Sequence, residues 1–112
     1  MTKELIPKSM LDKLPKLYET EGGVYDNLMC QVKLFSPIGI GTWYIIEYDP
    51  EEELAFGYVD LGYPELGYFS LKELKDINLP YGLKIERDMS WKPQPLSKVE
   101  KAHQAMYELN PI

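Results

Sequence analysis

Residues 42–48 read Thr-Trp-Tyr-Ile-Ile-Glu-Tyr, and the organisation of the whole chain can be worked out from this segment. β-Branched and aromatic residues dominate it, and its middle is apolar on both faces, which is typical of a strand inside a sheet. Asp49-Pro50 begins a turn, and Leu54–Val59 is a second run of strand-forming residues. The sequence therefore predicts an antiparallel hairpin with residues 49–53 as its loop.

Further strands are predicted on both sides of this hairpin. Leu28–Phe35 shows the alternation of a half-buried strand, and the proline and glycines of residues 36–41 form a turn after it. On the C-terminal side, Leu66–Phe69 and Leu83–Asp88 are short extended segments, and Trp91–Pro95 is typical of an extended connector. The predicted sheet thus has four or five strands.

Serine residues mark the starts of two predicted helices. Ser70 and Glu73 fit a capping box, and Ser97 and Glu100 repeat it before a C-terminal helix. A further short helix is predicted at Ser9–Leu14. The C-terminal helix is expected to bury an apolar stripe against the sheet, formed by Val99, Ala102, Met106 and Leu109.

Length and composition indicate one α+β domain. The 112 residues are 45% hydrophobic and 27% charged, as in ordinary globular domains. We expect a single domain over residues 1–112, with an antiparallel sheet of four to five strands, a C-terminal helix and short peripheral helices. A run of about 18 apolar residues is lacking, and so is the apolar segment of a signal peptide. The expected location is the cytoplasm, which suits a lone cysteine, Cys30.

Acidic and aromatic residues are concentrated in residues 34–70. This segment holds seven acidic residues, no Lys or Arg, and nine of the 14 aromatic residues. The net charge of -6 has the wrong sign for binding a phosphate backbone. The sequence therefore predicts an acidic, aromatic sheet whose partner is neither nucleic acid nor a membrane.

Motifs of catalysis are missing from the sequence. It contains no P-loop, no Gly-x-Gly-x-x-Gly, no His-Glu-x-x-His and no Gly-x-Ser-x-Gly. His103 is the single histidine, and its expected place is the surface of the C-terminal helix. Cys30 lies on the apolar face of its strand, which favours an inert buried thiol over a nucleophile paired with His103. No cofactor is expected.

Carboxylates remain as candidates for metal binding or acid–base chemistry, because Mg²⁺ and Ca²⁺ prefer oxygen ligands. The acid at residue 49 is explained by the turn that it begins, and the acids at residues 51–53 are explained by a solvated hairpin tip. Because neither explanation needs a metal, no metal site is assigned. Arg87 is expected to face inward and bind an acid such as Glu65. The acids at predicted strand ends and turns are Glu47, Asp49, Asp60, Glu65, Glu86 and Asp88.

Several blocks of the sequence resemble a family of small bacterial and phage proteins known only as a domain of unknown function. The most specific block is Glu-Leu-Gly-Tyr-Phe-Ser at residues 65–70. The resemblance runs from Leu14 to Ser97, and such proteins are common on plasmids and integrative elements. It implies an accessory protein of a mobile element and supplies no activity. The other blocks are Leu-Pro-Lys-Leu-Tyr at 14–18, Thr-Trp-Tyr at 42–44, Ile-Glu-Arg-Asp at 85–88 and Pro-Leu-Ser at 95–97.

A non-catalytic, protein-binding role is favoured by these patterns. Strand alternation places Trp43 and Tyr44 on opposite faces, and Tyr63 and Trp91 lie beside prolines of turns, so we expect some of these four rings to be partly exposed. Exposed rings beside acids would suit a partner protein with a basic surface. The predicted binding residues are Tyr44, Glu47, Tyr63, Glu65 and Trp91.

Two other functions stay open at this point. The first is an anti-defence inhibitor that imitates DNA and fills the basic groove of a host nucleic-acid enzyme with the acids of residues 34–70. The second is a carboxylate-metal hydrolase. The sequence leaves the oligomeric state open.

Overall fold

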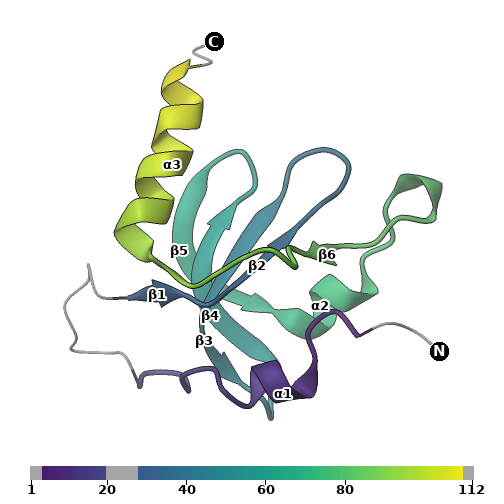
Figure 1. Cartoon of the computed structure of the whole chain (residues 1–112). Helices are drawn as coiled ribbons and strands as arrows, with labels where there is room; N and C mark the ends of the chain where they lie inside the picture. Colours follow the sequence, from purple (N-terminus) through teal and green to yellow (C-terminus); the bar gives the residue numbers. More distant parts are fainter. Residues whose placement is uncertain (1–3, 20–27, 110–112) are drawn as a thin grey trace.

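The chain forms an antiparallel sheet of five strands, in the order β5-β4-β3-β2-β6 (Figure 1). A computed structural model describes residues 4–19 and 28–109, apart from the side chain of residue 109. The α+β class, the antiparallel sheet and the C-terminal helix are as predicted from the sequence. The five strands are β2 (Val32–Phe35), β3 (Thr42–Asp49), β4 (Leu54–Asp60), β5 (Pro64–Ser70) and β6 (Glu86–Arg87).

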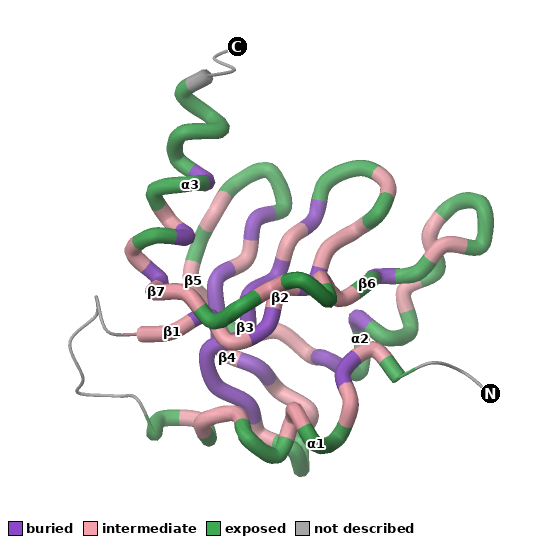
Figure 2. The backbone as a smooth tube through the Cα atoms, in the orientation of Figure 1, coloured by how far each residue is buried: buried purple, intermediate pink, exposed green. Residues whose placement is uncertain are grey.

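Strand β3 lies at the centre of the sheet, between β2 and β4. Six of its eight residues are buried, because both faces of the sheet are covered. Trp43 packs into the core on one face, and Tyr44 packs into the core on the other. These two rings are therefore buried, whereas Tyr63 is 77% exposed and Trp91 is partly exposed, so the expectation that some of the four rings are partly exposed is correct for the last two. Figure 2 shows the buried residues concentrated in β3 and β4.

The first face of the sheet is covered by the N-terminal segment and by helix α2 (Leu71–Asp76). Ile6, Leu71 and Leu74 are buried against Trp43 and other residues of this face. Short helix α1 (Lys8–Leu11) lies at the edge of this layer. As predicted, Ser70 caps α2, since its Oγ accepts a hydrogen bond of 3.1 Å from the backbone N–H of Glu73.

The second face is covered by helix α3 (Leu96–Leu109) and by a small second sheet. This sheet pairs β1 (Met29–Cys30) with β7 (Gln94–Pro95). The predicted strand of residues 28–35 is thus split at Gln31, whose N–H donates to the carbonyl of Ile45 while β1 turns toward β7. Helix α3 begins at Leu96, so Ser97 lies inside its first turn and is not the N-cap that the sequence predicted.

Helix α3 packs on the sheet from Leu96 to His103, and its last turns project away from the sheet (Figures 1 and 2), held there by the bond from Tyr107 to Asp60 of β4. Leu96, Val99 and His103 are buried, whereas Ala102 is exposed and Met106 is 55% exposed. The prediction of a buried apolar stripe is therefore correct at Val99 and wrong at Ala102 and Met106. The side chain of its fourth residue, at position 109, lies outside the described part of the structure.

The two edges of the five-stranded sheet differ. Edge strand β6 has two residues and is much shorter than the predicted segment 83–88. Arg87 in β6 donates from Nε to the carbonyl of Leu5 at 3.1 Å, whereas Glu65 lies on β5 at the opposite edge. The predicted contact between Arg87 and Glu65 is therefore wrong. In the described part of the chain, no helix is long and apolar enough to cross a membrane.

Candidate functional site

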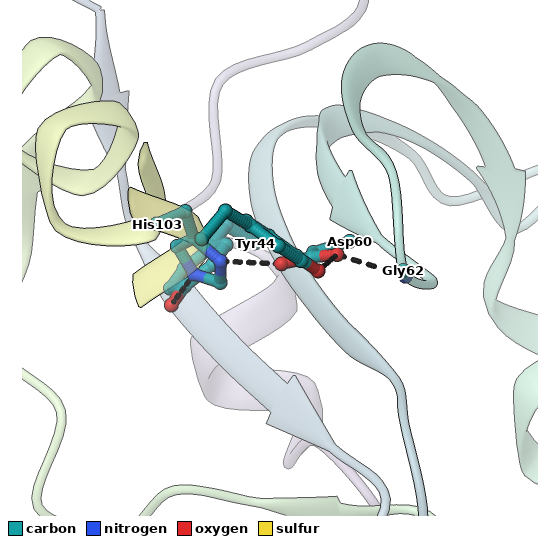
Figure 3. A network of polar contacts seen from close by, with 5 residues as sticks. Tyr44, Asp60, Gly62 and His103 are labelled. Atoms are coloured by element: carbon teal, nitrogen blue, oxygen red, sulfur yellow. Dashed lines mark hydrogen bonds and ion pairs between the residues drawn. The ribbon is translucent and has the colours of Figure 1, made fainter. Parts of the chain in front are cut away.

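A buried polar network joins the end of β4 to α3 (Figure 3). Asp60 ends β4, and its Oδ2 lies 2.7 Å from Nδ1 of His103. The other ring nitrogen of His103, Nε2, lies 2.8 Å from the hydroxyl of Tyr44 on β3. Oδ1 of Asp60 accepts hydrogen bonds from the Tyr107 hydroxyl at 2.7 Å and from the Gly62 N–H at 2.9 Å. One carboxylate thus binds α3 at two points and orders the turn after β4.

The protonation states in this network follow from its geometry. Burial raises the pKa of Asp60, but hydrogen bonds from Tyr107, His103 and Gly62 outweigh it, so the pKa is lowered from its ordinary value of 3.8. An ionised Asp60 only accepts, so Nδ1 of His103 carries a proton. Burial and nearby negative charge raise the pKa of Tyr44, so its hydroxyl keeps its proton beside Nε2 of His103.

The sequence predicted a surface position for His103, and this prediction is wrong because the side chain is buried. It is 5% exposed, and both of its ring nitrogens are bonded, so it cannot activate Cys30. Burial raises the pKa of the Cys30 thiol to about 12, which makes it the inert thiol that was predicted. The helical spacing of Leu96, Val99 and His103 places all three residues on one face, and this spacing could have predicted the burial of His103. The prediction was missed because histidine is a polar residue that is usually found at the surface.

A pocket of about 280 Å³ lies beside this network, between α3 and the start of β3. The ring of Trp91 forms one wall; its centroid lies 5.2 Å from that of Tyr44, and its Nε1 donates to the carbonyl of Cys30 at 3.0 Å. Nζ of Lys33 lies 5.9 Å from the Tyr44 ring centroid and 5.7 Å from that of Trp91. The full lining is Lys33, Thr42, Tyr44, Trp91, Gln94, Val99, Ala102, His103 and Met106.

The five residues predicted to bind a partner do not form one surface. Tyr44 and Trp91 meet in the pocket. Glu47 lies further along β3, is buried, and accepts a hydrogen bond of 3.0 Å from the backbone N–H of Tyr18. Tyr63 and Glu65 are exposed, at the turn before β5 and on β5 itself. Burial therefore removes Tyr44 and Glu47 from any protein-binding surface of this structure.

Strand β5 forms a long sheet edge. Of the described strands it pairs with β4 alone, and none of its seven residues is buried. Two exposed aromatic rings accompany it: Tyr63, in the turn before β5, is 77% exposed, and Tyr68 is 52% exposed, with its ring tilted by 51° against that of Phe56 at 5.1 Å between centroids. The charged side chain on this strand is Glu65. This edge is the largest strand surface left without a partner strand among the described residues.

The acids of residues 34–70 are dispersed rather than gathered on one face. Glu47 and Asp60 are buried, and Oε1 of Glu53 lies 2.6 Å from Nζ of Lys75. The acids of the loop at residues 49–53 lie at the opposite end of β4 from the turn before β5. Among residues 4–19 and 28–109, no group of three or more His, Cys, Asp or Glu side chains is placed to hold a metal ion.

Comparison with known proteins identifies the family of the chain. A search of the curated proteins and a search of the solved structures found no match. The family described as "Protein of unknown function (DUF2958)" matches residues 5–107, which is most of the chain. This agrees with the resemblance noted in the sequence blocks between residues 14 and 97. The chain therefore belongs to the DUF2958 family of proteins of unknown function.

Proposed function

We propose that this protein is a non-catalytic binding protein that takes up an extended segment of a partner protein along the edge of β5. The observation that carries the proposal is the seven-residue edge strand, which has no buried residue and pairs with β4 alone among the described strands. Such an edge presents backbone N–H and C=O groups to a further strand, and natural proteins usually shorten or cover it. The opposite edge, β6, is shortened to two residues.

Side chains along β5 define the partner segment. Glu65 gives the edge a negative charge and favours Lys or Arg on the incoming strand. Tyr63 and Tyr68 flank it with flat rings, which give contact area at a low cost in side-chain entropy. The segment is therefore extended and basic, with apolar side chains at alternate positions.

The alternatives draw less support from the geometry. DNA imitation requires a continuous acidic surface, whereas the acids of residues 34–70 are partly buried, partly paired and divided between two ends of the sheet. A carboxylate-metal hydrolase requires a ligand cluster, and the described residues contain none. The proposed setting is the bacterial cytoplasm, where the protein acts as an accessory factor of a plasmid or phage, as the resemblance of the sequence blocks suggests.

Selection from a displayed library of random ten-residue peptides tests the proposal. We expect the selected peptides to alternate apolar and other residues, to carry Lys or Arg, and to protect the amides of β5 from hydrogen exchange when bound. Their affinity should fall as salt rises, because the charges are near the surface. Glu65→Lys should weaken binding by about tenfold, because the attraction between Glu65 and a basic residue of the peptide is replaced by repulsion between two positive charges.

Matched variants on other surfaces serve as controls. Glu86→Lys makes the same charge change on the opposite sheet edge. Tyr63→Asn removes one of the flanking rings and should also weaken binding, and its control Tyr81→Asn removes a ring that is 89% exposed in the short 3-10 turn Pro80–Gly82. Both controls should bind the peptides as the parent does. Peptides that protect another element, or that bind the Glu65→Lys and Glu86→Lys proteins equally well, contradict the proposal.

A further inference from the structure

We propose that the pocket between α3 and β3 is a second binding site, which takes a small planar aromatic carboxylate. This site is separate from the β5 edge, because no residue of β5 lines it. The inference rests on three features of the pocket: its size, the flat rings in its walls, and the sign of its charge.

The pocket has the size of one or two fused rings. Its volume is about 280 Å³. An apolar cavity of about 150 Å³ is enough for benzene, so this pocket holds a molecule of roughly twice that size. The rings of Tyr44 and Trp91 form its walls, and Val99, Ala102 and Met106 contribute apolar atoms from α3. Flat aromatic walls favour a planar ligand that stacks on them.

The charge of the pocket favours an anion. Among the described residues that line it, Lys33 is the only lysine or arginine and there is no Asp or Glu, although the chain as a whole has a net charge of -6. Lys33 Nζ lies above both aromatic rings and forms an ion pair with Oδ2 of Asp88 at 3.9 Å, a distance too long for a hydrogen bond. The ammonium group therefore keeps donors for a ligand carboxylate. In the described part of the chain, the side chains of Thr42 and Gln94 make no hydrogen bond and add polar partners at the same lining.

The polar network behind the pocket holds the site rigid and gives it no catalytic group. Nε2 of His103 is bonded to the hydroxyl of Tyr44, and Nδ1 is bonded to Asp60. These atoms are thus satisfied within the protein, and the two rings meet edge to face with centroids 5.4 Å apart. A ligand meets fixed ring faces rather than an acid or a base, so the site binds its ligand without changing it.

A series of naphthalene probes of one shape and different charge tests the proposal by calorimetry and by chemical shifts of the pocket residues. We expect 2-naphthoate to bind, with shifts at Trp91 and Ala102. Its neutral isostere 2-naphthamide should bind about tenfold more weakly, the usual effect of a lost hydrogen bond to a charged group, and 2-naphthylmethylammonium should bind more weakly still. Equal binding of 2-naphthoate and 2-naphthamide, or no binding of 2-naphthoate at millimolar concentration, overturns the proposal.

Variants separate the charge of the pocket from its space. Lys33→Met keeps the aliphatic stem and should weaken 2-naphthoate about tenfold without affecting 2-naphthamide, whereas Lys72→Met, an exposed position on α2, should change neither.

Ala102→Trp places a ring in the pocket from an exposed helix position and should abolish the binding of both 2-naphthoate and 2-naphthamide. Ala105→Trp, exposed on α3 outside the lining, should leave the binding of both probes intact. Unchanged 2-naphthoate binding by a folded Ala102→Trp protein places the ligand elsewhere and overturns the proposal. Binding of the basic peptides at β5 is measured on the same proteins, so the two proposals fail independently.

Discussion

Asp60 shows how much of this structure depends on one side chain. It is 4% exposed, and its two oxygens accept three hydrogen bonds, from His103, Tyr107 and Gly62. Two of these donors belong to α3, which leaves the sheet soon afterwards. A buried carboxylate is stable only when donors replace its hydration, and here they do so fully. The ionised Asp60 therefore helps to hold α3, and with it one wall of the pocket, together with the buried Leu96 and Val99.

Asp60→Asn should lower the free energy of unfolding by about 2 kcal/mol at pH 7, because an amide cannot accept from all three donors. The folded-state pKa of Asp60 lies below its ordinary value of 3.8, so the unfolded chain takes up the proton first as the pH falls. The stabilisation is thus complete well above pH 3.8 and is lost as the pH falls through the folded-state pKa.

Urea unfolding between pH 3 and pH 7 measures this difference. The stability gap between the parent and Asp60→Asn should narrow toward the acid end, whereas Asp76→Asn, an exposed position on α2, should leave the stability almost unchanged throughout. A gap that stays constant down to pH 3 would mean that the Asp60 carboxylate is not the stabilising species.

At the scale of elements, two paired glycines differ in the space around them. Gly57 on β4 lies opposite Gly67 on β5. A Cβ on Gly57 would lie 1.7 Å from the carbonyl oxygen of Tyr44, next to the register shift between β3 and β4, whereas a Cβ on Gly67 would meet nothing within 4 Å. Gly57→Ala should cost at least about 3 kcal/mol, because a backbone atom has to move, and Gly67→Ala should cost less than about 0.5 kcal/mol. Thermal unfolding of the two variants side by side checks this, and similar melting temperatures would contradict the close approach.

Helix α3 gives a second contrast between neighbouring positions. Val99 is 3% exposed and packs with Tyr44 and Leu96, whereas Met106 is 55% exposed. Val99→Asp buries a charge among apolar groups and should cost several kcal/mol, about 3 or more. Met106→Asp should change the stability by less than about 1 kcal/mol. Equilibrium unfolding in urea distinguishes the two, and a large loss in Met106→Asp would show that the outer turns pack against another part of the chain.

The elements that the sequence predicted well are those with a local signal. Alternation and turn residues gave the β3–β4 hairpin, and the hydroxyl of Ser70 with Glu73 gave the start of α2. The contacts that it missed join residues far apart in the chain: 59 positions separate Tyr44 from His103, and 43 separate Asp60 from His103. No periodicity relates such residues. The covering of both faces of β3 also depends on α3, which no pattern within residues 42–48 can reveal.

At the scale of the whole molecule, the fold is a sheet with two cores and unequal edges. The N-terminal segment with α2 closes one face, and the β1–β7 sheet with α3 closes the other. The protected centre is β3, and the exposed periphery contains β5 and the outer turns of α3. The proposed binding edge of β5 lies at this periphery, whereas the proposed pocket site lies between α3 and the start of β3, with the buried Tyr44, Val99 and His103 in its lining.

This arrangement predicts a gradient of local stability across the molecule. Strands β3 and β4 each lie between two other strands of the sheet, so their amides should exchange with solvent only through global unfolding and be the slowest of all. Helix α1 has four residues and none is buried, and residues 104–108 of α3 are exposed, so their amides should exchange at least about 100-fold faster through local opening. Hydrogen exchange followed by NMR measures these rates directly. Protection of residues 104–108 equal to that of β3 would show that α3 is held along its whole length, and the Asp60 network would then be only one part of its attachment.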